Sequence, residues 1–199
     1  MVKIISLDMQ GTLTQSTFSD YFWLEFLPKK YSEKFYCTIE KAKQNISKEF
    51  CKLGKYNILY YDDRYWAKKL DFDTKKELDN FIIRPKFNNE LYDFIQTIKL
   101  PKIIVSTTTD LFINYELDGN IKDFNRVYSC VDDFKTGGKT KDIFLKICNE
   151  LHVCPNEVLH IGDSKLMDYE NARKAGINAI LFNGDLTKLK RDVNKYLEV

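Results

Sequence analysis

Short apolar runs rich in Ile, Val, Leu and Phe alternate along the chain with longer segments in which apolar residues recur at helical spacing. Runs this short and this continuous are typical of strands that are buried on both faces of a sheet. We expect strands at residues 2–7, 102–105, 126–129, 157–161 and 179–182. Helical segments separate the later strands, so the pattern predicts an α/β protein with a doubly wound parallel sheet.

Apolar residues three or four positions apart mark the helices of this α/β unit. The stripes are Leu91, Phe94, Ile95 and Ile98; Phe144, Ile147 and Leu151; Ala172 and Ala175; and Leu186, Leu189, Val193 and Leu197. Each lies between two predicted strands or after the last one. These helices are expected to cover the two faces of the sheet.

The first two predicted strands are separated by residues 8–101, far more than one crossover connection needs. Further stripes predict a helical insertion there: Phe18, Phe22 and Phe26; Phe35, Ile39, Ala42, Ile46 and Phe50; Tyr61, Tyr65 and Lys69; and Leu78, Phe81 and Ile82. Thr74 and Glu77 have the spacing of a capping box, and Arg84-Pro85 is expected to form the return hinge. We therefore predict a core of residues 1–14 and 87–199 and a helical domain of residues 15–86.

Composition narrows the class of protein and its partners. The 199 residues are 44% apolar, and 31 Lys and Arg balance 29 Asp and Glu without a long block of one sign. Nucleic acid and membranes are therefore not expected partners, and we expect a cytoplasmic protein. The five cysteines include no C-x-x-C pair and are predicted to be buried or half-buried thiols. His160 lies within an apolar run and is expected to be a core imidazole with satisfied nitrogens.

Candidate chemistry begins where the first strand ends. The apolar run 4–7 leads directly into Asp8, and Gly11 then turns the chain into a cluster of hydroxyl residues. Ligands of open α/β sheets bind at the carboxyl ends of strands, and an aspartate held there can attack a bound phosphorus atom. Asp8 is the candidate nucleophile.

Two further strand ends and one loop supply polar groups. Ser106 and Thr107 follow the second strand, and Gly162-Asp163 through Asp168 follow the fourth. Because the strands are expected to be parallel, these groups should meet Asp8 at one edge of the sheet. Lys139, with Lys141 as its rival, follows two glycines in a loop that can bring an ammonium to the same cleft.

Each candidate has an expected role. Asp8, Asp163, Asp168 and the backbone carbonyl of Gln10 are the expected ligands of one Mg²⁺ ion, because magnesium prefers oxygen ligands. Ser106, Thr107 and the backbone near Gly11 are expected to bind phosphoryl oxygens. Lys139 is expected to neutralise the substrate phosphate and Asp8, since an anionic nucleophile is otherwise repelled by an anionic substrate.

In this order, the motifs resemble those of the haloacid dehalogenase (HAD) superfamily of hydrolases. Residues 8–12 match the first motif, Ser106 the second, Lys139 the third, and residues 162–168 the fourth. The resemblance implies a Rossmann-like core, a mobile helical cap that selects the substrate, and Mg²⁺ as cofactor. It also implies a phosphatase acting on small phosphorylated metabolites, in which Asp8 forms an aspartyl-phosphate that water hydrolyses.

One position departs from the family's phosphatase pattern. The aspartate that usually stands two residues after the nucleophile, and serves as acid and base, is Gln10 here. An amide does neither at neutral pH, so a contribution of roughly 10²- to 10⁴-fold is expected to be missing. A slow phosphatase is the main expectation, unless Asp62 or Asp63 of the cap supplies the acid.

The same departure leaves three other readings open. A phosphonate hydrolase would need a cap lysine such as Lys48 or Lys52 to form a Schiff base. A dehalogenase needs no metal, and the presence of Asp163 and Asp168 argues against it. A catalytically weak module that binds phosphorylated ligands or has a regulatory role is the third.

Residues 60–66, in which tyrosines and a tryptophan stand beside charges, are the expected substrate contact of the cap. The oligomeric state is left open.

Overall fold

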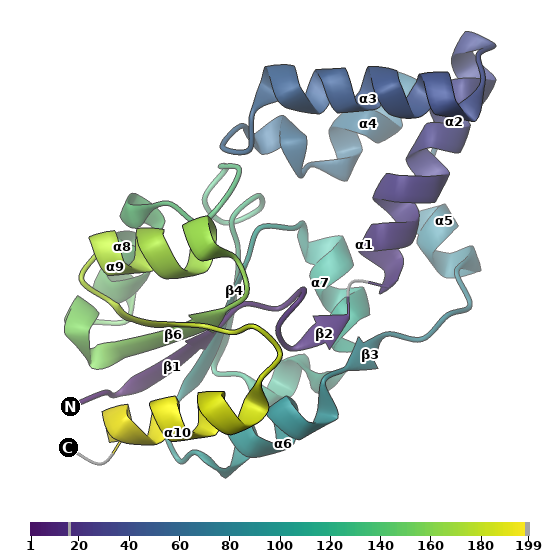
Figure 1. Ribbon diagram of the computed structural model, residues 1–199. Coiled ribbons are helices and arrows are strands. Elements are labelled where there is room, and N and C mark those ends of the chain that lie inside the picture. Colours follow the sequence, from purple (N-terminus) through teal and green to yellow (C-terminus); the bar gives the residue numbers. More distant parts are fainter. Residues whose placement is uncertain (16, 198–199) are drawn as a thin grey trace.

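A five-stranded parallel sheet forms the centre of the computed structural model, which describes residues 1–15 and 17–197 (Figure 1). The strand order is β5-β4-β1-β6-β7. The strands are β1 (Ile4–Leu7), β4 (Lys102–Ser106), β5 (Arg126–Ser129), β6 (Val158–Gly162) and β7 (Asn178–Leu181). Each corresponds to one predicted strand with ends shifted by at most two residues. The doubly wound α/β fold is confirmed.

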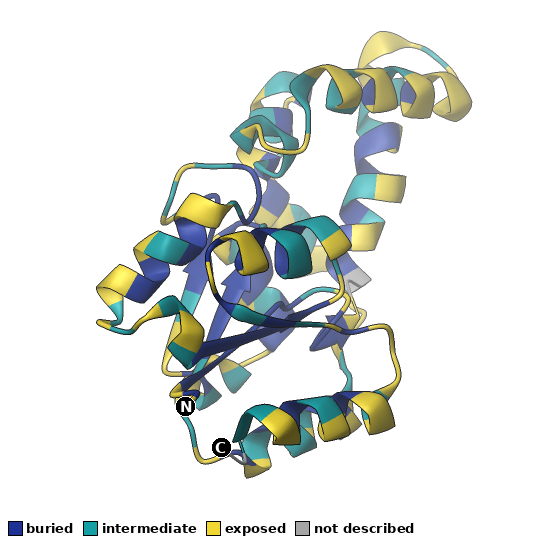
Figure 2. Ribbon diagram, turned by 60° about the vertical axis from the view of Figure 1, so that its left-hand side comes forward, coloured by how far each residue is buried: buried dark blue, intermediate teal, exposed yellow. Residues whose placement is uncertain are grey.

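Helices cover both faces of this sheet, and the buried strands run between them (Figure 2). Alternate residues of β1 separate the faces: Ile5 packs with the cluster beneath α6, α7 and α10, and Ile4 packs with the cluster beneath α8 and α9. These helices are α6 (Asn89–Thr97), α7 (Asp110–Leu117), α8 (Lys141–Glu150), α9 (Asn171–Lys174) and α10 (Leu186–Leu197). No helix of the described residues is long and apolar enough to cross a membrane.

Short helical segments complete the connections. Three are 3₁₀ turns, at Ile58–Tyr60, Asn120–Asp123 and Pro155–Glu157, and two are π-helical, at Phe22–Phe26 and Lys165–Glu170. The sequence pattern did not distinguish these from ordinary helix or loop. The π-helical segment Lys165–Glu170 follows β6 directly and carries Asp168, so its geometry decides where that carboxylate lies.

The segment between β1 and β4 contains a helical insertion, defined here as residues 17–80 (Figure 1). Its helices are α1 (Thr17–Tyr21), α2 (Leu27–Phe35), α3 (Ile39–Leu53), α4 (Asp63–Leu70) and α5 (Thr74–Asn80). The predicted stripe of Phe18, Phe22 and Phe26 is buried and packs against Phe112 of α7. The rings of Phe18 and Phe112 lie 4.9 Å apart between centroids. This aromatic cluster fixes the insertion to the α/β core.

A two-stranded antiparallel ribbon stands where the chain leaves and rejoins the core. In it β2 (Thr14–Gln15) pairs with β3 (Lys86–Phe87), Thr14 opposite Phe87 and Gln15 opposite Lys86. Strands of two residues carry no periodicity, so the sequence did not predict them. The domain boundaries expected after residue 14 and before residue 87 fall within this ribbon.

Two helix ends in the insertion correct the sequence analysis. Phe35 does not share a helix with Ile39, because Tyr36 adopts a left-handed conformation (φ 49°) and Thr38 caps a new helix. The predicted capping box is also wrong: Asp73, rather than Thr74, accepts the hydrogen bond from the Lys76 amide.

The last predicted stripe of the insertion ends early. Helix α5 stops at Asn80, and Ile82 is 93% exposed instead of lying on the helix.

The cysteines also differ from expectation. Cys130 and Cys148 are buried and Cys37 is half-buried, whereas Cys51 and Cys154 are exposed.

Candidate active site

Asp8 lies immediately after β1, at the point where the chain order of the sheet reverses between β4 and β6. Its backbone amide donates to the Ile161 carbonyl of β6 (2.8 Å), and the residue is 7% exposed. The turn that follows is closed by a hydrogen bond from the Gly11 amide to the Thr14 carbonyl (2.9 Å), with Gly11 at φ 81°. Asp8 is therefore presented at the switch point of a doubly wound sheet, where ligands of such folds bind.

Lys139 reaches Asp8 from the loop before α8. Its ammonium Nζ lies 2.5 Å from Asp8 Oδ1 and also pairs with Asp168, and the side chain is almost wholly buried. The Lys139 carbonyl accepts a hydrogen bond from Asn171 Nδ2 (2.7 Å), which anchors the loop. Lys141 is the exposed first residue of α8 and lines no part of the cavity around Asp8. Of the two lysines, the structure brings Lys139 to the site.

The segment after β6 supplies two carboxylates of different character, Asp163 from the connecting turn and Asp168 from the π-helical segment. Asp168 is buried, and its Oδ2 accepts from the Ser164 amide (2.8 Å). Asp163 is exposed, with Thr12 Oγ1 at 3.5 Å from its Oδ1. Oxygen atoms of Asp8, Asp163 and Asp168 all lie within 4.8 Å of one another. The structure thus brings together the three acidic residues that the sequence analysis selected.

His160 connects this cluster to the interior of the sheet. Its Nε2 lies 3.1 Å from Asp168 Oδ1 and its Nδ1 lies 2.7 Å from Ser6 Oγ. A carboxylate only accepts, so the proton is on Nε2 and the Ser6 hydroxyl donates to Nδ1. Burial lowers the pKa of His160, which keeps the ring neutral. The expected core imidazole with two partners is found, but its link to Asp168 was not foreseen.

The charges of the site do not balance. One ammonium, Lys139, faces the carboxylates of Asp8, Asp163 and Asp168. Burial raises the pKa of Asp8 well above its ordinary value, and repulsion from Asp168 adds to this despite the attraction of Lys139. For Asp168, burial is outweighed by Lys139 and His160, so its pKa is lowered. The site therefore favours an additional cation.

The hydroxyl residues after β4 divide into a buried one and a cavity-lining one. Ser106 is buried, and its Oγ accepts a long hydrogen bond from the Thr108 amide (3.4 Å). Thr107 lines the cavity next to Asp8 and Lys139. Sequence reasoning favoured Ser106 because it ends the strand, but Thr107 presents a surface to the cavity.

Gln10 lines the same cavity and is held by the insertion. Its side-chain amide donates to Ser19 Oγ of α1. The two carboxylates considered as substitutes are engaged elsewhere: Asp62 caps α4 and pairs with Arg64 (2.7 Å), and Asp63 accepts from Thr109 (2.9 Å). Neither lines the cavity around Asp8.

The space in front of Asp8, here called the reaction cavity, measures about 190 Å³. Of the aromatic residues in segment 60–66, Tyr61 lines it, while Tyr65 and Trp66 pack within the insertion. Burial raises the pKa of Tyr61 to about 12, so its hydroxyl keeps its proton at neutral pH and remains a hydrogen-bond donor. The substrate contact expected of segment 60–66 stays a prediction, and Tyr61 is the ring of that segment that lines the reaction cavity.

A sheet of this order, with an aspartate at the switch point and a lysine and two further acids around it, defines a hydrolase of the HAD class. The family model described as "haloacid dehalogenase-like hydrolase" matches residues 2–176, and the chain belongs to this family. The resemblance drawn from the motifs is confirmed.

Solved structures show the same fold at low sequence identity. The HAD phosphatase from Thermococcus onnurineus superposes with a TM-score of 0.76 at 20% identity, covering 93% of this chain and 88% of that one. The HAD family enzyme BT-2542 from Bacteroides thetaiotaomicron, in complex with magnesium and inorganic phosphate, gives 0.65 at 16% identity, over 95% and 99% of the two chains.

A curated relative matches part of the chain. The GMP/IMP nucleotidase YrfG of Escherichia coli (strain K12) is 24% identical over 98 residues, which is 49% of this chain and 44% of the nucleotidase. The match therefore spans less than half the length of that relative.

Proposed function

We propose that the protein is a Mg²⁺-dependent phosphatase that hydrolyses small phosphate monoesters through an aspartyl-phosphate on Asp8. The observation that carries this proposal is the meeting of Asp8, Lys139 and Asp163 around one small polar cavity at the switch point of the sheet. The T. onnurineus phosphatase and the E. coli nucleotidase, which are named for phosphate ester chemistry, are similar to this chain and support the reaction class.

The proposed reaction has two steps. A carboxylate oxygen of Asp8 attacks phosphorus, the bond from phosphorus to the ester oxygen breaks, and the leaving oxygen takes a proton from water. Water then attacks the phosphorus of the acyl phosphate, which releases inorganic phosphate and restores the Asp8 carboxylate. Lys139 offsets the negative charge of both partners, and the Thr107 hydroxyl offers a donor to phosphoryl oxygens.

The residues present fit a magnesium ion. Asp8 and Asp163 would hold it, with the Gln10 carbonyl as the proposed third protein ligand, because Mg²⁺ prefers a few hard oxygen atoms and keeps several waters. Asp168 has both oxygens engaged by Lys139, His160 and the Ser164 amide, so we assign it the task of holding Lys139. When bound, the ion would supply positive charge to the phosphoryl group.

Gln10 makes the proposed enzyme slow toward poor leaving groups. Its amide has no proton to release, and neither Asp62 nor Asp63 lines the reaction cavity.

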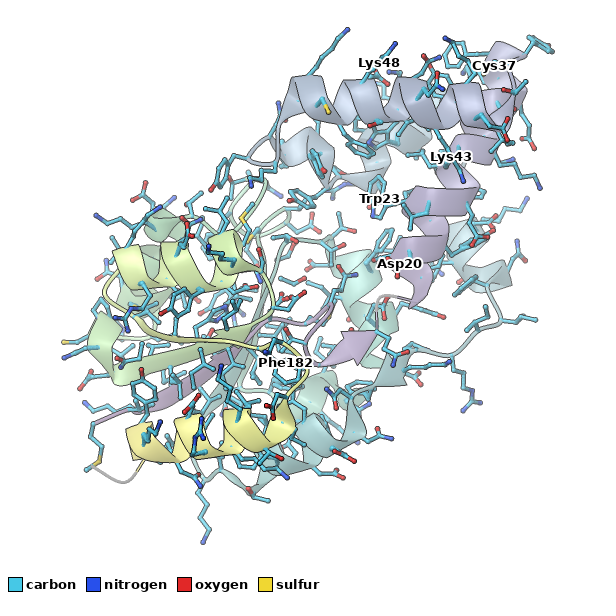
Figure 3. The ribbon with its side chains drawn as sticks, in the orientation of Figure 1. Asp20, Trp23, Cys37, Lys43, Lys48 and Phe182 are labelled. Atoms are coloured by element: carbon cyan, nitrogen blue, oxygen red, sulfur yellow. The ribbon has the colours of Figure 1, made fainter. Side chains whose placement is uncertain are left out.

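The rival reactions fit the site less well. A dehalogenase does not need the acidic cluster, and Lys48 and Lys52, the lysines considered for a phosphonate hydrolase, are exposed on α3. Lys48 points away from the core (Figure 3).

The decisive experiment measures hydrolysis of 4-nitrophenyl phosphate by the purified protein. Wild type is expected to turn over with Mg²⁺ and to stop when EDTA removes the ion, and Asp8→Asn is expected to be inactive. Asp71→Asn, a substitution at an exposed position just after α4, serves as the control. Equal rates for wild type and Asp8→Asn would reject the proposal. Tight binding of inorganic phosphate without turnover would favour a binding module.

A further inference from the structure

Two further cavities follow the reaction cavity toward the insertion, and each neighbouring pair shares lining residues. Gln10, Tyr61 and Thr107 line both the reaction cavity and a middle cavity of about 350 Å³. Trp23, Leu24, Phe50 and Tyr60 line both the middle cavity and a distal groove of about 690 Å³. The three cavities therefore lie in a row from Asp8 into the insertion, and their combined size is that of a site for an extended organic molecule.

The middle cavity is lined by two chemically different groups of residues. One is aromatic and consists of Trp23, Phe50, Tyr60 and Tyr61. The other carries hydroxyl, amide and carboxylate groups from Gln10, Ser19, Asp20, Thr107 and Thr108. A sugar ring has the matching character, because its C–H face packs on aromatic rings while its hydroxyls need hydrogen-bond partners. A purely apolar chain would offer no hydrogen-bond partner to the polar groups of this lining.

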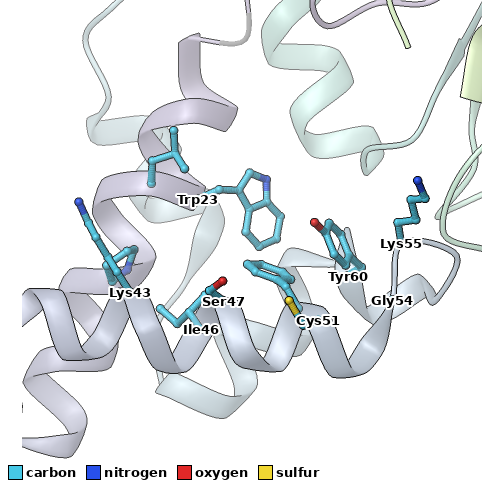
Figure 4. Close-up of a pocket in the computed structure, with 11 residues that line it drawn as sticks. Trp23, Lys43, Ile46, Ser47, Cys51, Gly54, Lys55 and Tyr60 are labelled. Carbon is cyan, nitrogen blue, oxygen red and sulfur yellow. The ribbon is translucent and has the colours of Figure 1, made fainter. Parts of the chain in front are cut away.

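The distal groove is apolar and aromatic (Figure 4). The Trp23 and Phe50 rings lie 5.8 Å apart edge to face, and Phe50 lies 4.6 Å from Tyr60, between centroids. Lys43 stands at one end of the groove and Lys55 at the other (Figure 4). Such a wall of rings suits a flat ring system, which gains stacking contacts without needing many specific hydrogen bonds.

We propose that the substrate class is nucleoside monophosphates, with the phosphate in the reaction cavity, the sugar in the middle cavity and the base in the distal groove. This inference rests on the proposed function. A simple aryl phosphate fits less well, because its ring follows the phosphate directly and would occupy the polar middle cavity while the groove stayed empty. The order of small polar, mixed and aromatic compartments matches the order of phosphate, sugar and base.

The test compares a purine nucleoside 5′-monophosphate with ribose 5-phosphate, which lacks only the base. Wild type is expected to show a kcat/KM at least about tenfold higher for the nucleotide. Ser47→Trp places a bulky ring into the groove from the exposed face of α3, and is expected to remove most of that advantage while leaving ribose 5-phosphate unchanged. Lys48→Trp, one residue further along α3 and pointing away from the core, is the matched control.

The outcomes separate this inference from the proposed function. If ribose 5-phosphate and the nucleotide have equal kcat/KM values, or if Ser47→Trp and Lys48→Trp behave alike, the nucleotide assignment is wrong while the phosphatase stands. If neither ester is hydrolysed faster than by Asp8→Asn, the phosphatase is wrong. Calorimetric binding of the nucleotide to Asp8→Asn still tests the cavity, since Ser47→Trp in that background should weaken binding about tenfold or more.

Discussion

The Lys139 ammonium lies 2.5 Å from Asp8 Oδ1, in a site where both side chains are almost entirely shielded from water. The same ammonium pairs with Asp168, so one cation joins residues that are far apart in the sequence. In so little solvent, removing the cation leaves two carboxylates facing each other without compensation. We therefore expect Lys139 to be central to both the proposed chemistry and the stability of the site.

Replacing Lys139 by Met, which keeps the length and removes the charge, is expected to lower kcat/KM for an aryl phosphate by about 10²-fold or more. It should also lower the free energy of unfolding by about 3–5 kcal/mol, because Asp168 loses its buried partner. Steady-state kinetics and urea denaturation measure the two effects. Lys141→Met, on the exposed start of α8, is the control. If the two variants have the same activity, the assigned role of Lys139 is wrong.

Gln10→Asp is expected to raise the turnover of alkyl phosphates by between about 10- and 10⁴-fold, because it restores a group that protonates the leaving oxygen and activates water. Gln10→Asn is the matched control, since it shortens the side chain equally and loses the contact with Ser19 without gaining an acid. The pH–rate profile of the aspartate variant should show a new ionisation. No increase relative to Gln10→Asn would mean that another group already acts as the acid.

Gly11→Ala tests the Mg²⁺ site. A methyl group on Gly11 would lie 2.5 Å from Asp163 Oδ2, so the carboxylate must move. We expect the Mg²⁺ concentration for half-maximal activity to rise about tenfold, as expected when a metal site is perturbed. Gly54→Ala is the control, because its φ of 73° imposes a similar backbone strain while nothing lies within 4 Å. Both variants should lose about 1 kcal/mol of stability. If Gly54→Ala raised the Mg²⁺ requirement as much as Gly11→Ala, the assignment of Asp163 as a ligand would be wrong.

Glu116 of α7 is expected to make stability depend on pH. It is fully buried, and neither carboxylate oxygen has a hydrogen bond of ordinary geometry. Burial raises its pKa to about 7, which the nearby amides of Ser19 and Phe18 only partly oppose. The ordinary pKa of a glutamate is 4.5. Between pH 4.5 and pH 7, Glu116 therefore keeps its proton in the folded protein but has released it in the unfolded chain, so stability falls as pH rises.

The expected loss over this interval is on the order of 3 kcal/mol. Glu116→Gln should remove that slope and be more stable than wild type above pH 7, as measured by chemical denaturation from pH 5 to 8. Glu90→Gln, an exposed substitution on α6, controls for the loss of one negative charge. Parallel pH profiles for wild type and Glu116→Gln would show that the carboxyl is not held neutral by the fold.

The sheet and its covering helices were predictable because burial imposes a strong pattern on the sequence. Ile4, Ile5 and Leu7 are apolar since β1 is packed on both faces, and the Phe18 stripe is apolar since it meets Phe112. Features of two or three residues carry no such pattern. The pairing of Thr14 with Phe87 depends on distant segments, and the choice of Asp73 over Thr74 as a cap depends on which residue leaves helical geometry.

In the candidate site, the positions of the strand ends predicted which residues lie close together. They did not predict the direction in which each side chain points. Asp8, Asp163 and Asp168 were selected because parallel strands end at one edge of a sheet. The orientation of Thr107 rather than Ser106 toward the cavity, and the link from His160 to Asp168, are set by side-chain packing. The aromatic wall of Trp23, Phe50 and Tyr60 comes from separate helices and leaves no motif.

The short ribbon of β2 and β3 lets the helical insertion change independently of the five-stranded sheet. Because the chain departs and returns through adjacent paired strands, the helices between them can be lengthened, shortened or exchanged without shifting the register of the five-stranded sheet. Asp8, Asp163 and Lys139 all lie on the sheet side of that junction. Under the proposed function, changes in the helices would alter the substrate while Asp8, Asp163 and Lys139 keep their positions.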